Sequence, residues 1–264
     1  MTVGLRSEAG VAGVAVPGPV LFARYAFPPN ALGYCGPGDS HALLEYAAAT
    51  TVDRGLVELA KAFEGAWPYL ELIAAANGIR DPLDRAVVEA YWVGNALLDH
   101  VPTRLLAASL DDRFRRRAGR RWEKVLAPVG AGAVAHHNLH VLGVSPWIGL
   151  LRGGDVEPAL TVLDQCRIRE GRIESIDGDR ALVRTRPLVW EDEVLRLGPA
   201  AVEPAVVAVD GLTLVDVAVG DWVALHWDWV CDRLDDRQRL ALRRATAQIL
   251  ACCAPAGSTA ANHP

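Results

Sequence analysis

The sequence predicts an α+β protein in which an N-terminal all-α helical bundle is followed by a small β-barrel and a C-terminal helix. Three observations support this fold class. Apolar residues recur at three- and four-residue spacing in the first 150 residues, short alternating runs begin after Pro158, and helical spacing returns over 235–253. Because the hydrophobic period changes near residues 154–163, where glycines and a proline cluster, we expect a domain boundary there.

The N-terminal part predicts an arm and about five helices. Residues 1–20 hold Gly, Ala, Val and Pro without a period and predict a flexible arm, and residues 22–38, which contain a Pro-Pro pair, predict a turn-rich loop. Helical spacing and N-capping residues predict further helices, which complete a helical domain over residues 21–154. These helices are expected at 40–49, at 52–77, from 82, at 103–126 and, as a short segment, before Pro146.

The C-terminal part predicts short strands. Residues 167–175 alternate between polar and apolar, and the Asp-Gly-Asp sequence at 177–179 indicates a hairpin. Several short strands separated by turns are typical of a small barrel. Further strands are expected at 181–189, 191–197, 205–209, 213–217 and 221–229. With the helix at 235–253, the second domain spans residues 160–254, and residues 255–264 predict a frayed tail.

Two motifs stand at the ends of this β region. Cys166 is followed by Gly171 and by the run RIESIDGDRALV, and the sequence VGDWVALHWDWV, which contains His226, precedes the last helix. With these motifs, residues 163–250 resemble the HypC family of small chaperones for nickel–iron hydrogenase maturation. The stretch from Arg184 to Asp216 is longer than in that family, and the helical domain is similar only to an uncharacterised bacterial family.

The resemblance implies a HypC-like (OB-like) barrel with a defined role. Proteins of that family, together with a HypD-like scaffold protein, carry an iron atom with cyanide and carbon monoxide ligands, and they dock on the hydrogenase large-subunit precursor. Their essential cysteine matches Cys166, and their strand histidine matches His226. This sequence departs from the family because its cysteine is internal and Glu170 replaces the usual proline before the glycine.

Strand geometry places the matching cysteine and histidine together. First and last strands of an antiparallel barrel are commonly neighbours, so Cys166 before the first strand and His226 on the last predicted strand should lie close. The two-residue side-chain period directs Val223 and Leu225 into the barrel and His226 outward. We therefore expect a partly exposed thiol–imidazole pair that binds iron or a partner. Alone, Cys166 would instead be interpreted as a small buried apolar residue.

A second candidate metal site lies in the helical domain. His136 and His140 have the i, i+4 spacing of two ligands on one helix face, and His137 lies between them. Cys35 occupies a glycine-rich turn and could complete a site for iron or another metal. The alternative interpretation is a polar helix face with one buried, hydrogen-bonded imidazole.

Composition excludes several classes of protein. With 51% hydrophobic and 22% charged residues the chain is globular, and no run approaches the roughly 18 apolar residues of a membrane helix. Five cysteines, an odd number, and the absence of a signal peptide favour reduced thiols in the cytoplasm. The six arginines of 113–121 share a helix with an apolar stripe, which indicates a solvated face and no nucleic-acid partner.

The sequence thus predicts an accessory factor of nickel–iron hydrogenase maturation, a binding protein and not an enzyme. One alternative is a metal-binding enzyme or sensor centred on Cys35, His136, His137 and His140, with the barrel as a docking module. Another is a structural module whose barrel has lost its cargo.

Overall fold

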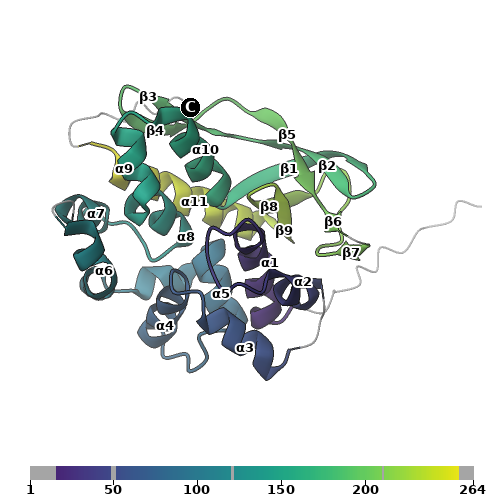
Figure 1. Ribbon diagram of the computed structural model, residues 1–264, viewed down its shortest axis with the longest axis horizontal. Coiled ribbons are helices and arrows are strands. Elements are labelled where there is room, and N and C mark those ends of the chain that lie inside the picture. The colour runs from purple at the N-terminus through teal and green to yellow at the C-terminus, as the bar shows by residue number, and fades with distance from the viewer. Residues whose placement is uncertain (1–15, 49–51, 120–121, 210, 256–264) are drawn as a thin grey trace, which may run out of the picture.

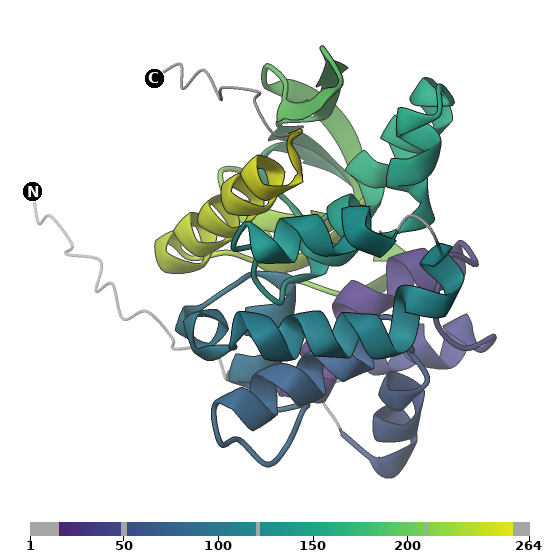
Figure 2. The same cartoon turned by 90° about the vertical axis from the view of Figure 1, so that its left-hand side faces the viewer.

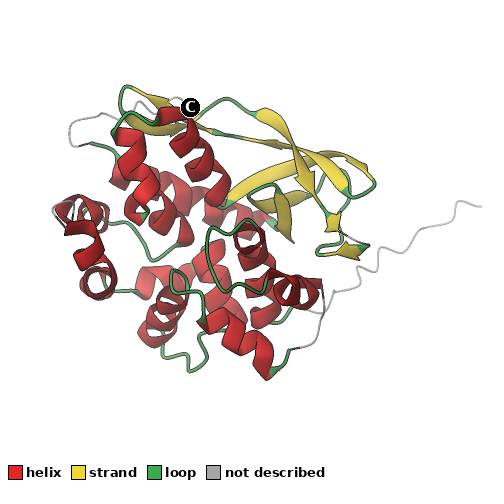
Figure 3. Cartoon of the chain, in the orientation of Figure 1, coloured by secondary structure: helices red, strands yellow, loops and turns green. Residues whose placement is uncertain are grey.

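The fold is of the mixed α+β class, as predicted. The computed structural model describes residues 16–48, 52–119, 122–209 and 211–255. Helices fill the lower and left-hand parts of Figure 1, the longer strands gather at the upper right, and some short strands lie at the top left, as the colouring of Figure 3 shows. The helical N-terminal part and the C-terminal helix are confirmed. In chain order the helical elements are α1 (Gly18–Ala31), α2 (Ser40–Ala48), α3 (Arg54–Lys61), α4 (Trp67–Ala76), α5 (Arg85–Trp92), the 3₁₀-helix η1 (Ala96–His100), α6 (Thr103–Ala118), α7 (Trp122–Gly130), α8 (His137–Leu139), the π-helix η3 (His140–Val144), α9 (Pro146–Arg152), α10 (Val156–Cys166) and α11 (Asp236–Cys253).

Helix α1 corrects two expectations at once. Of the predicted flexible arm, residues 1–15 lie outside the described part, but Gly18 already begins a helix that also replaces the predicted loop as far as Ala31. Residues 32–39 form turns and bends, as predicted. The two prolines fall in the last turn of α1, at Pro28 and Pro29, where each removes only one amide donor. Burial of nearly every side chain from Val20 to Asn30 outweighs this loss.

Two predicted long helices are each broken into two. The expected helix at 52–77 ends at Lys61 and restarts at Trp67, because Pro68 can occupy the first turn of a helix but not its interior. The expected helix at 103–126 ends at Gly119, whose φ of 53° stops the helix. The helix predicted at 235–253 is confirmed as α11, and a capping box between Asp235 and Gln238 fixes its start.

Five strands close into a barrel in the order β1-β2-β5-β9-β8. Strand β1 pairs with β2 and β8 in antiparallel fashion, with Arg169 opposite Leu225, so the predicted contact between the first strand and the histidine strand is confirmed. The pairs β3-β4 and β6-β7 form two small separate sheets. The strands are β1 (Arg169–Asp177), β2 (Arg180–Thr185), β3 (Leu188–Glu191), β4 (Val194–Leu197), β5 (Ala201–Val206), β6 (Ala208–Val209), β7 (Leu212–Thr213), β8 (Trp222–His226) and β9 (Trp229–Arg233).

Strand β9 was missed by the sequence analysis. A tight turn at Trp227 and Asp228 reverses the chain directly after β8, and Trp227 adopts a left-handed φ of 55°. Such a turn normally contains glycine or asparagine, and neither residue is present here. The hairpin therefore gave no sequence signal.

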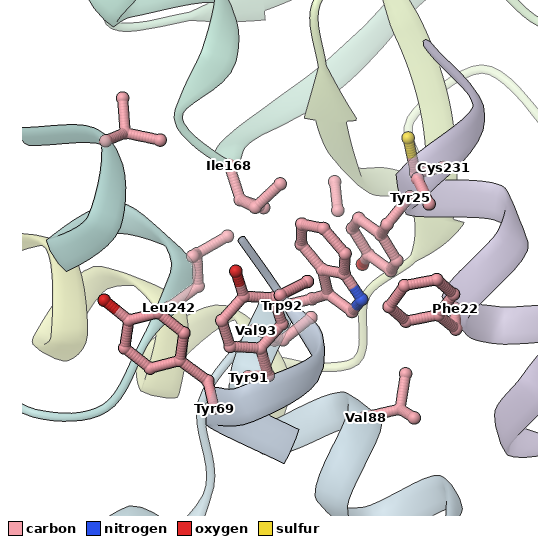
Figure 4. Packing of buried hydrophobic residues seen from close by; sticks show 14 of the residues in the cluster. Phe22, Tyr25, Tyr69, Val88, Tyr91, Trp92, Val93, Ile168, Cys231 and Leu242 are labelled. Carbon is pink, nitrogen blue, oxygen red and sulfur yellow. The ribbon is translucent and has the colours of Figure 1, made fainter. Parts of the chain in front are cut away.

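Helices and barrel share one continuous core. Helix α1 lies against β8 and β9, and α11, yellow in Figure 2, lies between the green strands and the teal helices. Buried residues from both halves belong to a single cluster, in which Trp92 packs between Tyr25 and Tyr91 (Figure 4). The predicted boundary near residues 154–163 falls on the turn after α9 and on the first part of α10, and a separate second domain over residues 160–254 stays a prediction. Of the predicted tail, residues 256–264 lie outside the described part.

Candidate metal site at His137, Cys166 and His226

Three of the six candidate residues converge on one point. The ligand atoms of His137, Cys166 and His226 all lie within 4.8 Å of one another. His137 begins α8, Cys166 ends α10 and His226 ends β8. The predicted pairing of Cys166 with His226 is thus confirmed, and the third member comes from the other predicted site.

Backbone contacts hold the three elements together. The amide of Trp227, just after His226, donates to the carbonyl of Gln165, just before Cys166, at 2.7 Å. The side chain of Asn138, next to His137, exchanges two hydrogen bonds with the backbone of Ile168 at 2.7 and 3.1 Å. Each candidate ligand therefore neighbours a residue that fixes its position.

His226 is buried, contrary to the expected partly exposed site. It points out of the barrel as predicted, but α1 covers that face and the side chain is 0% exposed. At the other end of the same face, the guanidinium carbon of Arg239 on α11 lies 4.2 Å from the centroid of the Trp222 ring. The outer face of β8 is therefore an internal packing surface, which a strand pattern alone does not reveal.

The hydrogen bonds of His226 determine its tautomer. Its Nδ1 lies 2.6 Å from the backbone carbonyl of Tyr25. A carbonyl can only accept, so Nδ1 carries the proton and the neutral ring has its lone pair on Nε2. That Nε2 atom is buried and has no hydrogen-bond partner. It is the kind of nitrogen that a metal ion binds.

His137 has partners at both ring nitrogens. Its Nε2 lies 2.9 Å from the carbonyl of Cys166, and its Nδ1 lies 3.2 Å from the Tyr91 hydroxyl. The carbonyl requires a proton on Nε2, so Tyr91 donates to Nδ1. The ring also packs on Trp92, with centroids 4.6 Å apart.

Burial keeps all three groups neutral. It lowers the pKa of His226 to about 3, with the positive charge of Arg169 adding to the effect. Burial, followed by the neighbouring His226, lowers the pKa of His137 well below its usual value. Burial also raises the pKa of the Cys166 thiol to about 12, although the Arg169 charge and the indole N–H of Trp227 oppose this rise. The cluster therefore offers two neutral imidazoles and a protonated thiol.

Cys35 lies near the cluster without joining it. The Asn30 side chain donates to the carbonyls of Cys35 and Pro37 at 2.8 and 2.6 Å and so shapes the turn. Cys35 is exposed as a whole residue, yet desolvation raises the pKa of its thiol to about 12, and this thiol in turn raises the pKa of Cys166. We take the exposed part to be the backbone of the turn and the thiol to face inward.

His136 and His140 serve packing instead of the cluster. His136 has an extended backbone with φ −114° and ψ 152°, so the two residues do not share a helix face as predicted. The Nδ1 atom of His136 accepts from the amide of Asn138 at 2.9 Å and caps α8. His140 packs edge-on against Tyr69 with centroids 5.8 Å apart. Among the described residues, neither belongs to a group of converging ligands.

A family model covers both halves of the molecule. Residues 14–259 match DUF6390, a family of unknown function. The chain belongs to this family. No curated protein and no solved structure matches it. The DUF6390 match spans helices and barrel together, in keeping with their shared core.

Within the described part of this DUF6390 chain, no helix combines the length and the apolar character needed to cross a membrane. In the predicted arginine run, Arg115 is exposed, whereas Arg113 lies over the Tyr69 ring at 4.7 Å, so the run is a solvated face only in part.

Several residues that shape the site escaped the sequence analysis. Tyr91, Trp227 and the carbonyl of Tyr25 each contact a candidate ligand. Asn138 and Trp227 had a local signal, because they adjoin His137 in the HHNLH motif and His226 in the VGDWVALHWDWV motif. Tyr25 and Tyr91 come from distant segments, and no spacing in the sequence connects them to the cluster.

Proposed function

We propose that this protein is an accessory factor of nickel–iron hydrogenase maturation, which holds an iron intermediate as cargo at Cys166 and His226. The observation that supports this best is that the two side chains lie within 4.8 Å of each other. They do so at the junction of β1 and β8, where the resemblance to the HypC family places its cysteine and histidine. The barrel beside them is closed and five-stranded.

The chemistry of the pair suits this cargo. A thiolate is a soft ligand and an imidazole a borderline one, and both favour low-spin iron over magnesium or calcium. The cargo would enter past Cys166, which is half-buried, because His137 and His226 are buried. Next to Cys35, the Tyr34 ring packs on Trp227 with centroids 4.3 Å apart.

The proposed partners are the large-subunit precursor and a HypD-like scaffold protein, in the cytoplasm. The test is anaerobic purification of the tagged chain from its native host. We expect both partners to co-purify, and infrared spectroscopy to detect iron-bound carbon monoxide and cyanide. Absence of the large subunit from every preparation would contradict the proposal.

A matched pair of variants sharpens this test. Cys166→Ala removes little buried volume, so it should preserve the fold and yet block maturation. Cys252→Ala removes a partly buried thiol far from the cluster and should leave maturation intact. Full hydrogenase activity in the Cys166→Ala strain would exclude the proposed role of this thiol.

A metal sensor is the second candidate function. It is favoured by His137, which comes from the helical part and brings a third ligand to the barrel. A sensor would retain its metal without any hydrogenase partner. Metal content in a host that lacks hydrogenase genes would separate the two functions.

A further inference from the structure

We infer that His137, Cys166 and His226 form a resident site for a divalent transition-metal ion, with three protein ligands and one open coordination position. The site shares Cys166 and His226 with the proposed iron site and adds His137. The inference goes beyond the proposed function, because metal binding here needs neither a hydrogenase nor an iron intermediate.

The spacing of the ligands suits a small ion. Metal–nitrogen distances of about 2.0–2.1 Å and metal–sulfur distances of about 2.3 Å place tetrahedral ligand atoms about 3.3–3.7 Å apart. The three atoms lie within 4.8 Å of one another without an ion. Closing the shell therefore takes movements of about 1 Å or less, within the reach of side-chain rotation.

His226 is oriented as a ligand before any metal arrives. Its Nε2 lone pair is buried without a partner, while its Nδ1 proton is held by the Tyr25 carbonyl. Ligating histidines in proteins commonly donate their other ring N–H to a carbonyl or carboxylate, which fixes ring orientation and raises ligand basicity. An unpartnered buried nitrogen costs stability unless something binds it, and a metal ion would satisfy it.

His137 can adapt to the metal through Tyr91. In the structure the Tyr91 hydroxyl donates to Nδ1. A hydroxyl can also accept, so the ring can change tautomer and donate from Nδ1 to Tyr91. The nitrogen now hydrogen-bonded to the Cys166 carbonyl would then be free to bind the ion. This change of tautomer moves one proton from Nε2 to Nδ1, so the imidazole stays neutral.

Cys166 would bind as a thiolate and release one proton to solvent for each ion bound. The Trp227 side chain lowers the pKa of this thiol, and its buried indole N–H has no hydrogen-bond partner. It would therefore stabilise the thiolate formed on metal binding. Trp227 is 9% exposed, so this donor acts in a dry environment.

The donor set selects the class of ion. Two imidazoles and one thiolate favour Zn²⁺, Co²⁺ or Fe²⁺ over Mg²⁺ and Ca²⁺, which prefer oxygen. No carboxylate belongs to this group of converging ligands. Three protein ligands leave a fourth position for water, for an exogenous ligand or for the Cys35 thiol.

The test is a titration of the purified, reduced, full-length chain with Co²⁺. We expect one equivalent to bind with thiolate-to-cobalt charge-transfer bands and the visible bands of tetrahedral cobalt. Zn²⁺ should displace the cobalt, and Mg²⁺ should not. Absence of the charge-transfer bands in the unmodified protein would overturn the inference.

Variants assign the third ligand. His137→Ala should weaken Co²⁺ binding at least tenfold, since one of three ligands is lost. His140→Ala, a partly buried histidine outside the cluster, should bind Co²⁺ within about twofold of the unmodified protein. Equal affinity in the His137→Ala and unmodified chains would remove His137 from the site.

A stability readout covers the case in which His137→Ala does not fold. Saturating Zn²⁺ should raise the melting temperature of the unmodified chain and of His140→Ala. The rise should be absent in Cys166→Ser, which differs by one atom. An equal rise in Cys166→Ser would contradict the site. Neither result depends on hydrogenase partners, so failure of the proposed function and failure of this inference are distinguishable.

Discussion

His226 and Tyr25 are joined by a 2.6 Å hydrogen bond from the imidazole Nδ1 to a backbone carbonyl 201 residues away. Within α1 this carbonyl would normally accept from the amide of residue 29, four positions later. That residue is Pro29, which has no amide proton. The proline thus leaves the Tyr25 carbonyl free to hold the histidine.

Pro29→Ala should weaken this hold. The new amide would compete for the Tyr25 carbonyl, and a loss of about 0.5–1.5 kcal/mol in the His226 bond corresponds to a roughly two- to tenfold lower Co²⁺ affinity. Pro28→Ala is the matched control, because the amide that it adds would donate to the Arg24 carbonyl, four positions earlier, and not to the Tyr25 carbonyl. An equal change in both variants would show that the effect is general to the helix.

His140 should make the protein sensitive to acid. Burial, followed by the charge of Arg113, lowers its pKa from 6.5 to about 4. The unfolded chain therefore binds the proton first, and the stability contribution is complete above pH 6.5 and lost as the pH falls toward 4. Because His140 is partly exposed, solvent screening reduces the expected loss between pH 7 and 5 to about 1 kcal/mol.

Urea unfolding at pH 7 and pH 5 measures this effect. His140→Gln should lose less stability over this interval than the unmodified chain. His41→Gln alters a histidine whose side chain is 80% exposed and should lose as much as the unmodified chain. Identical losses in all three proteins would assign the acid sensitivity to other groups.

Glu89 should be a main support of the contact between α5 and α11. Burial opposes its ionisation, but hydrogen bonds from Arg237, Gln238 and Asn95 lower its pKa. Glu89→Ala leaves the buried side-chain amide of Gln238 without this acceptor, whereas the Arg237 side chain is 60% exposed and can be solvated. An unsatisfied buried group costs about 1–3 kcal/mol, and we expect this loss by urea unfolding. Glu58→Ala, which breaks an exposed pair with Lys61, should cost less than about 1 kcal/mol. An equal loss of unfolding free energy in Glu89→Ala and Glu58→Ala would show that Glu89 does not hold α5 against α11.

Gly171 should be required for barrel packing. A Cβ atom there would lie 2.4 Å from Cγ1 of Val183, a buried residue on β2. Overpacking of this kind costs about 1–3 kcal/mol, so Gly171→Ala should lower the midpoint of unfolding. Gly38→Ala, where the added atom meets nothing within 4 Å, should leave the midpoint nearly unchanged.

The sequence predicted the α+β fold class and the proximity of two of the three clustered side chains, for identifiable reasons. Periodicity identified the helices and strands, and pairing of β1 with β8 placed Cys166 beside His226. The same reasoning could not show that α1 covers β8, because a strand pattern reveals a face but not what packs on it. Nor could spacing connect His137 with Cys166 and His226, which lie 29 and 89 positions further along the chain. Their contact depends on tertiary packing.

Two local surprises had different physical causes. Paired prolines predicted a loop where burial stabilises α1, so tertiary packing outweighed propensity. The turn before β9 gave no signal because Trp227, an unusual residue for a left-handed φ, occupies it. Tyr34 packs on this Trp227 ring.

The shared core also orders events during synthesis. The hydrogen-bond partner of His226 is the carbonyl of Tyr25, which leaves the ribosome some two hundred residues earlier. A nascent chain that has reached Cys166 still lacks His226, and the outer face of α1 then has no strand to cover it. Contacts of such long sequence separation form late in folding. The His-Cys-His cluster is therefore completed only after translation of β8, and incomplete chains lack one of the three ligands of the proposed metal site.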